Sequence, residues 1–232
     1  MVKPGSKLVF RESDHTYWYG EPDVGALLLS ATQFLKEGGL IDTTFYTAGS
    51  AEKGTFIHKA TELHDRPDME LEEDNLDPVI VPFLNAYKKF TADCKPKWRG
   101  IEMQLADPQL GIAGTVDRVG VMTPPGGSYS KPERVVLDIK SGSPRDWHAL
   151  QLACYQHLVT RDLLLSGAAS PVNSSKPLVE RYVLYLRKSG NYKVQKFSDV
   201  NDIAVCMAAL KIAQWRRANA LEVKNKRSRK RG

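Results

Sequence analysis

Hydrophobic positions recur along the chain with two different periods, and the changes of period mark the predicted elements. Apolar residues that return every three or four positions are typical of amphipathic helices. They predict helices over residues 30–35, 48–64, 79–92, 147–165 and 200–223. Alternation of apolar and polar residues is typical of strands. It predicts hairpins over residues 7–20 and 179–197 and single strands over residues 99–106, 112–122 and 134–140.

The order of these elements predicts an α/β fold with a mixed central β-sheet flanked by helices. A chain of 232 residues that is 42% hydrophobic can bury a sizeable core, so we expect one domain over residues 1–223. Its parts would be an N-terminal hairpin and helices (1–95), a core (96–166) and a C-terminal hairpin and helix (177–223). No apolar stretch of about 18 residues and no signal-peptide core is found. We therefore expect a cytoplasmic protein without a membrane span.

The net charge of +6 changes this picture only at the C-terminus. Residues 224–232 contain six Lys or Arg and no acid, so the rest of the chain is balanced. Such a tail could attract phosphates by counterion release or could simply be solvated, and the sequence leaves both open. Cys94, Cys154 and Cys206 lie far apart without a C-x-x-C spacing, which disfavours a disulfide framework and a zinc or iron–sulfur cluster.

Two of the predicted strands carry charges among apolar residues. Alternation places Asp117 on one face of strand 112–122, and Asp138 and Lys140 on one face of strand 134–140. Neighbouring strands can therefore direct the three side chains into one pocket. Unpaired buried charges are costly, so a cation or a function must compensate. For Asp138 and Lys140 alone, a solvent-facing pair at a strand end is the simpler interpretation. The presence of Asp117 on the neighbouring strand favours a shared pocket instead.

Carboxylates with room for water and phosphate are the ligands that Mg²⁺ requires. Such a cation lowers the pKa of water and neutralises charge on a phosphate under attack, while a nearby lysine can stabilise the developing negative charge. The backbone carbonyl of Ile139 could provide another oxygen. The pattern of Asp117, Asp138 and Lys140 therefore predicts metal-dependent chemistry on phosphates.

Four motifs occur in a recognisable order between residues 48 and 160. They are His58 in GTFIHKATEL, Asp117 in GTVDRVG, Asp138 and Lys140 in VVLDIKSG, and Gln151 and Tyr155 in QLACYQ. Together they resemble the PD-(D/E)XK nucleases, in particular their RecB-type and phage exonuclease branch. The resemblance implies a restriction-endonuclease-like fold. Thr115 and Val116 precede Asp117 where the family name has a proline.

The resemblance also implies a role for each matched residue. Asp117 and Asp138 would be metal ligands, the main chain of Ile139 a further ligand, and Lys140 the residue beside the attacking water. His58 would be an additional ligand or a group close to the metal. The iron–sulfur cluster of some relatives in this branch is not expected, because they hold it with four cysteines.

Gln151 and Tyr155, one helical turn apart, would line the site and hold Lys140 or the nucleic-acid backbone. Their alternatives are an ordinary surface residue and an ordinary core residue. His58 could instead be structural, as a single histidine on a helix more often is. Glu62, one turn after His58, could face the site or be solvated. Glu102 could give a carboxylate to a second metal or form a salt bridge at a strand edge.

These observations predict a nuclease that depends on Mg²⁺ or Mn²⁺ and hydrolyses DNA, single- or double-stranded. We expect an exonuclease of phage or recombination-repair type, because the connections between the motifs lack the clustered Arg, Asn and Gln suited to reading bases. A structure-specific endonuclease on the same site and a non-catalytic DNA-binding protein are the alternatives. A G-x-x-x-x-G-K-[ST] loop is absent, so ATP is not implied.

Overall fold

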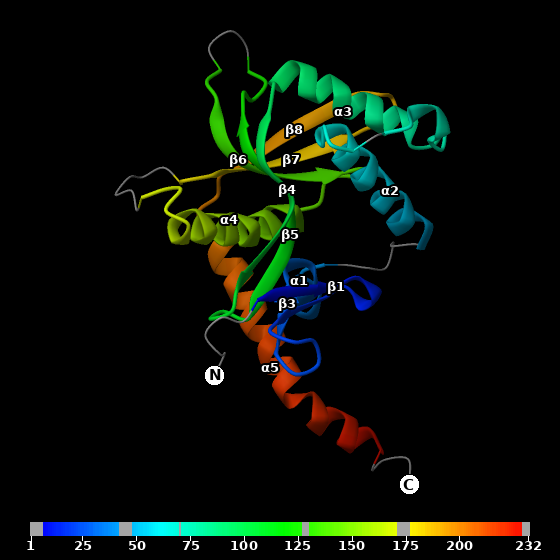
Figure 1. Cartoon of the computed structure of the whole chain (residues 1–232). Helices are drawn as coiled ribbons and strands as arrows, with labels where there is room; N and C mark the ends of the chain where they lie inside the picture. Colours follow the sequence, from blue (N-terminus) through cyan, green and yellow to red (C-terminus); the bar gives the residue numbers. More distant parts are fainter. Residues whose placement is uncertain (1–6, 42–47, 70, 127–129, 171–176, 229–232) are drawn as a thin grey trace.

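The computed structural model describes residues 7–41, 48–69, 71–126, 130–170 and 177–228, without the side chains at 48, 50, 51, 74 and 220–228. These residues form eight strands and five α-helices (Figure 1). The strands are β1 (Leu8–Arg11), β2 (Thr16–Tyr19), β3 (Ala26–Ser30), β4 (Lys97–Asp107), β5 (Ile112–Met122), β6 (Glu133–Lys140), β7 (Glu180–Leu186) and β8 (Tyr192–Phe197). The helices are α1 (Ala31–Glu37), α2 (Ala48–Asp65), α3 (Val81–Cys94), α4 (Trp147–Leu165) and α5 (Asp202–Ser228).

The mixed α/β fold expected from the sequence is confirmed, and the largest differences from the prediction are in β3 and α5, while most other ends differ by one or two residues. Strand β3 was not predicted, because its run of Ala, three Leu and Ser is too short and too uniformly apolar to show a period of two. Helix α5 continues to Ser228, five residues further than predicted. The first part of the predicted basic tail is therefore helical backbone, and residues 229–232 lie outside the described residues.

The eight strands form one open, mixed sheet with a fork in it. The order is β1-β2-β3-β5-β6-β7-β8, and β4 pairs with the other edge of β5. On the shared edge, β3 pairs in parallel with Ile112 and Ala113, whereas β6 pairs antiparallel from Arg118 to Met122. Residues 114–117 of β5 lie between these two partners. The sheet therefore opens beside the strand segment that ends at Asp117.

Helices cover both faces of the sheet (Figure 1). Helices α1, α4 and α5 bury one apolar cluster, which includes Phe34, Leu158 and Leu210. Helices α2 and α3 bury a second cluster on the other side, which includes Ile57 and Phe90. Burial of these apolar side chains is the main term that stabilises such a layered fold. The fork lies between the two clusters, where α2 and α4 approach the sheet from opposite sides.

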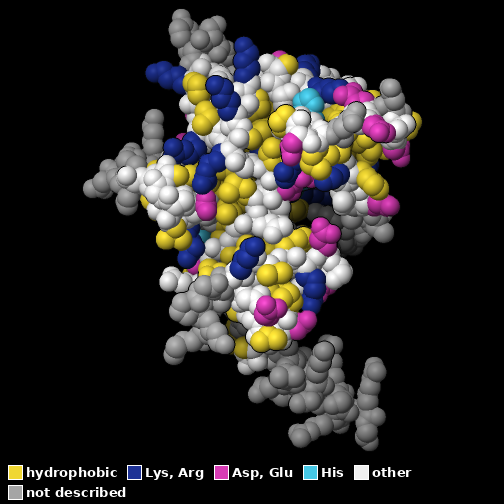
Figure 2. All heavy atoms as spheres, viewed as in Figure 1, with side chains coloured by type: hydrophobic (Ala, Val, Ile, Leu, Met, Phe, Trp, Pro, Cys, Tyr) yellow, Lys and Arg dark blue, Asp and Glu magenta, His cyan; other side chains and the backbone are white. Residues whose placement is uncertain are grey.

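The surface carries charges of both signs. Figure 2 shows Lys and Arg interspersed with Asp and Glu on the face viewed, and the acidic side chains gather at the right, over α2 and α3. Exposed acids of the connection between these helices include Asp68, Glu72, Glu73 and Asp77. Among the described helices, none has the length and apolar character that a bilayer crossing demands.

Candidate active site

The carboxylate of Asp117 bridges the fork in the sheet. The ladder between β5 and β6 ends at the pair Arg118 and Leu137, and beyond it the Ile139 N–H donates to Asp117 Oδ2 at 2.6 Å. The N–H and C=O of one residue in extended backbone point to the same edge of the strand. The Ile139 carbonyl therefore faces the same opening as the Asp117 carboxylate, as a main-chain ligand would require.

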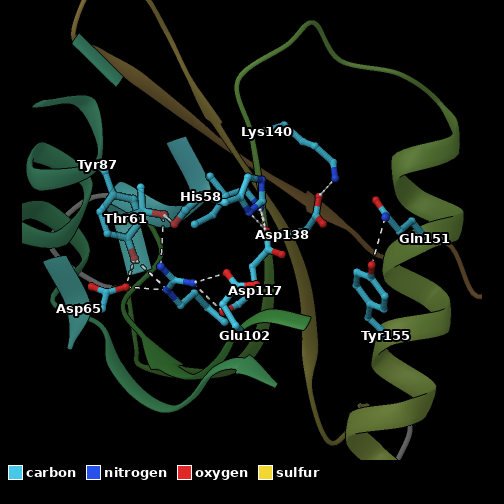
Figure 3. A network of polar contacts seen from close by, with 12 residues as sticks. His58, Thr61, Asp65, Tyr87, Glu102, Asp117, Asp138, Lys140, Gln151 and Tyr155 are labelled. Carbon is cyan, nitrogen blue, oxygen red and sulfur yellow. Dashed lines mark hydrogen bonds and ion pairs between the residues drawn. The ribbon is translucent and has the colours of Figure 1, made fainter. Parts of the chain in front are cut away.

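His58, Glu102 and Asp117 come together from α2, β4 and β5. One ligand atom from each lies within 4.8 Å of the other two, and His58 Nδ1 is 3.4 Å from Asp117 Oδ2 (Figure 3). Asp117 is buried, whereas His58 and Glu102 are partly exposed. One imidazole nitrogen and two carboxylates form a donor set that could hold a divalent cation. Glu102, for which the sequence left open a metal ligand or a salt bridge, lies in this group and also pairs with Arg118.

Glu102 has an unusual backbone for a strand residue. Its φ is 50°, in the left-handed region that costs a side-chain-bearing residue about 1 kcal/mol or more. Glu102 has no partner in the ladder between β4 and β5, in which Ile101 pairs with Arg118 and Met103 pairs with Val116. Burial, and secondly the charge of Asp117, raise the pKa of Glu102 to about 8. The site therefore holds this carboxyl at a position where its charge is unfavourable without a cation.

Arg118, the residue after Asp117, is fully buried and organises the other side of β5. Its guanidinium donates to Asp65 Oδ2 at 2.6 Å, to Glu102 Oε1 at 3.1 Å and to the Asp117 carbonyl at 2.7 Å. Tyr87 and Thr61 complete the network with contacts of 3.3 Å each. The strand alternation placed Arg118 away from Asp117 but gave no sign of this network. The only sign of such a network in the sequence was the presence of an Arg inside an otherwise largely apolar strand.

Asp138 and Lys140 form an ion pair beside the cluster. Lys140 Nζ lies 2.7 Å from Asp138 Oδ2, and the Asp138 side chain is only 2% exposed. Burial raises the pKa of Asp138 to about 6, although the Lys140 ammonium acts in the opposite direction. Lys140 Nζ also lies 5.7 Å from the centre of the Trp147 ring. The group of close ligand atoms around Asp117 does not include Asp138, whose charge nevertheless interacts with Asp117 and His58.

Gln151 and Tyr155 approach the fork from α4. Figure 3 shows them facing Asp138 and Lys140, on the side away from His58. Gln151 Nε2 donates to the Tyr155 hydroxyl at 3.2 Å, and both residues are buried, at 5% and 7% exposure. Gln151 is therefore no ordinary surface residue. A Cβ on Gly114 would lie 2.9 Å from Tyr155 Cε1, so the glycine makes room for this ring at the open part of β5.

Glu62 is engaged outside the cluster. Its carboxylate oxygens lie 3.0 Å from Lys59 Nζ and 3.0 Å from Arg66 Nε. These pairs are local to α2 and explain the position of the side chain without a cation. The role of Glu62 as a ligand stays a prediction, with less support than that of Glu102.

Two sequence comparisons with known proteins were without a match. No protein-family model matches it, and no curated protein matches it significantly in sequence. The resemblance to the PD-(D/E)XK nucleases therefore stays a prediction from the sequence motifs.

Proposed function

We propose that the protein is a divalent-cation-dependent nuclease of the PD-(D/E)XK type that hydrolyses phosphodiester bonds of DNA. The observation that supports it most is the convergence of His58, Glu102 and Asp117 next to the ion pair of Asp138 and Lys140. Glu102, Asp117 and the pair Asp138 and Lys140 belong to the neighbouring strands β4, β5 and β6 at a fork in a mixed sheet, which is the arrangement expected of a restriction-endonuclease-like core.

The residues present suit Mg²⁺ or Mn²⁺. Asp117, Glu102 and His58 would hold the cation, and Asp138 and the Ile139 carbonyl lie at the same opening. Both cations accept carboxylate and carbonyl oxygens, and Mn²⁺ accepts imidazole more readily than Mg²⁺ does. When bound, such an ion lowers the pKa of water and offsets negative charge on the phosphate.

The chain's own side chains supply the remaining parts of the reaction. Lys140 brings a positive charge to the place where negative charge develops on the phosphate oxygens, and Asp138 fixes this ammonium at 2.7 Å. The water oxygen bonds to phosphorus while the bond from phosphorus to the leaving sugar oxygen breaks, and that oxygen takes up a proton. The reaction thus consumes one water molecule and gives a phosphate monoester and an alcohol.

Selectivity for DNA ends is the second part of the proposal. The exposed acids of the connection between α2 and α3 would repel phosphates, and a site that contacts mainly phosphates carries no sequence information. A free terminus is the simplest geometry that can then select the bond to be cut. We therefore propose an exonuclease of phage or recombination-repair type rather than a sequence-specific endonuclease.

The test uses labelled linear DNA and covalently closed circles, single- and double-stranded, with Mg²⁺, Mn²⁺ or chelator. We expect linear DNA to be degraded to short products only with a cation, and closed circles to persist. Asp117→Asn is the matched inactive protein. Efficient cutting of circles would replace the exonuclease with an endonuclease on the same residues. Binding of DNA without any cleavage in either cation would refute the enzyme and favour a DNA-binding protein.

A further inference from the structure

In the side-chain amide of Gln151, the nitrogen has hydrogen-bond partners among the described residues and the oxygen has none. Its nitrogen, Nε2, donates to Thr32 Oγ1 at 3.1 Å and to the Tyr155 hydroxyl at 3.2 Å. Its oxygen, Oε1, is buried and has no hydrogen-bond partner among the described residues. Gln151 is only 5% exposed, and Figure 3 shows its oxygen on the side of Asp138 and Lys140. A buried carbonyl oxygen without a donor is costly, so a ligand with a hydrogen to donate belongs here.

Thr32 reaches this amide from a helix outside the four sequence motifs. Ser30 and Gln33 form a capping box at the start of α1, with contacts of 3.2 Å and 3.0 Å. This cap fixes the first turn of α1, in which Thr32 lies. Thr32 is itself exposed, so its hydroxyl meets Gln151 at the border of the site. The N-terminal part of the chain thereby contributes a contact to the catalytic region.

The chemistry of the neighbourhood limits what can occupy the position beside Oε1. Phosphate and carboxylate oxygens are acceptors, so they cannot pair with an amide oxygen. The ammonium of Lys140 pairs with Asp138 and makes no hydrogen bond to Oε1. A water molecule has hydrogens to donate and keeps a lone pair for attack on phosphorus. Because Oε1 points to the side of Asp138 and Lys140, a water bound to it would stand where the attacking water is expected.

We propose that Gln151 Oε1 accepts a hydrogen bond from the attacking water and that Thr32 is the positioning residue that keeps the amide in this orientation. This inference rests on the proposed nuclease function. The hydrogen bond leaves Gln151 unchanged by the reaction, because the amide neither gains nor loses a proton. It restricts the directions in which the water oxygen can face the phosphorus, which is a contribution to rate and not to binding.

The experiment compares Thr32→Val, Gln151→Ala and the double variant with the wild type in steady-state cleavage of linear DNA. We expect Gln151→Ala to lower kcat about 100-fold and Thr32→Val about tenfold, with KM and DNA binding in chelator unchanged. A residue that acts only through Gln151 has no effect once Gln151 is gone. The double variant should therefore cleave as slowly as Gln151→Ala alone.

Controls separate positioning from folding. Thr91→Val removes a hydroxyl that donates to the Lys88 carbonyl within α3 and should leave kcat unchanged. Thr32→Ser keeps the hydroxyl and should restore most of kcat. A readout independent of activity is the pair of Gln151 side-chain amide resonances, assigned by their loss in Gln151→Ala. These resonances should shift in Thr32→Val and stay in place in Thr91→Val.

Three results would overturn the inference. They are an unchanged kcat in Thr32→Val, a rise in KM in place of the fall in kcat, and a double variant whose loss is the product of the two single losses. In each case the wild type still cleaves, so the nuclease proposal survives. A wild type that does not cleave DNA with either cation would remove both proposals together.

Discussion

Replacing Glu102 by glutamine should remove a dependence of stability on pH that the wild type shows without a cation. Burial raises the pKa of Glu102 from its ordinary 4.5 to about 8. Between these two values the folded protein holds a proton that the unfolded chain has lost. The stabilisation from protonated Glu102 is thus complete below about pH 4.5 and is lost as the pH rises through about 8.

The structure sets the size of the effect. One extra proton in the folded state changes the free energy of unfolding by about 1.4 kcal/mol per pH unit. The interval from 4.5 to about 8 therefore gives an upper limit of about 5 kcal/mol. The Glu102 side chain is 24% exposed and pairs with Arg118, and solvent screening lowers the expected loss to about 2 kcal/mol. The amide side chain of the Glu102→Gln variant can still accept the hydrogen bond from Arg118 but has no proton to lose.

Urea unfolding in chelator, followed by circular dichroism at several values between about pH 5 and about pH 8, measures this difference. The wild type should lose stability across the range, and Glu102→Gln should lose only the smaller part that comes from Asp138, whose pKa is about 6. Glu73→Gln, which alters an exposed acid that pairs with Lys88 away from the cluster, should follow the wild type. Equal slopes for the wild type and Glu102→Gln would refute the reasoning.

Three further predictions concern the ion pair, the buried arginine and the C-terminus. Lys140→Ala and Asp138→Asn should each abolish nearly all cleavage while circular dichroism and DNA binding in chelator stay close to wild type; normal turnover in either would exclude that residue from the mechanism. Arg118→Leu should destabilise the protein by about 3–5 kcal/mol in urea, because it leaves Asp65 and Glu102 without their cation; a loss below about 1 kcal/mol would mean that the network adds little. Deleting residues 224–232, which contain six Lys or Arg, should flatten the salt dependence of DNA binding by up to about 0.9 log unit per lost phosphate contact, and an unchanged slope would mean that the tail is merely solvated.

Much of the fold could be predicted because its elements have strong periods. Strand β5 and helix α4 have the predicted ends, since eleven and nineteen residues are long enough to show alternation or helical spacing. Alternation along β6 puts Leu137 and Ile139 on one face, and both lie in the cluster under α2 and α3. Alternation along β5 puts Val116 and Arg118 on one face as well, but in the structure Val116 belongs to the other cluster and Arg118 is directed to Asp65.

The rest of the site depends on contacts that a linear pattern does not contain. The left-handed backbone of Glu102 interrupts the ladder beside Val116 and Arg118, and nothing in the residues around it indicates such a turn of the chain. The contact of Thr32 with Gln151 joins residues 119 positions apart. Local sequence could identify which residues carry chemistry, but only the tertiary structure shows which of them share a hydrogen bond.

The fork in the sheet gives one carboxylate oxygen two tasks. Asp117 Oδ2 accepts a hydrogen bond from the Ile139 N–H at 2.6 Å and lies 3.4 Å from His58 Nδ1. A cation held by Asp117 and His58 would compete with this N–H for the lone pairs of the oxygen. The backbone amide of Ile139 is therefore a natural reporter of this site. Its hydrogen exchange with solvent should depend on cation concentration, whereas exchange at Val135, inside the regular ladder, should not. A single amide in the interior of the protein would thus record occupancy without substrate or turnover.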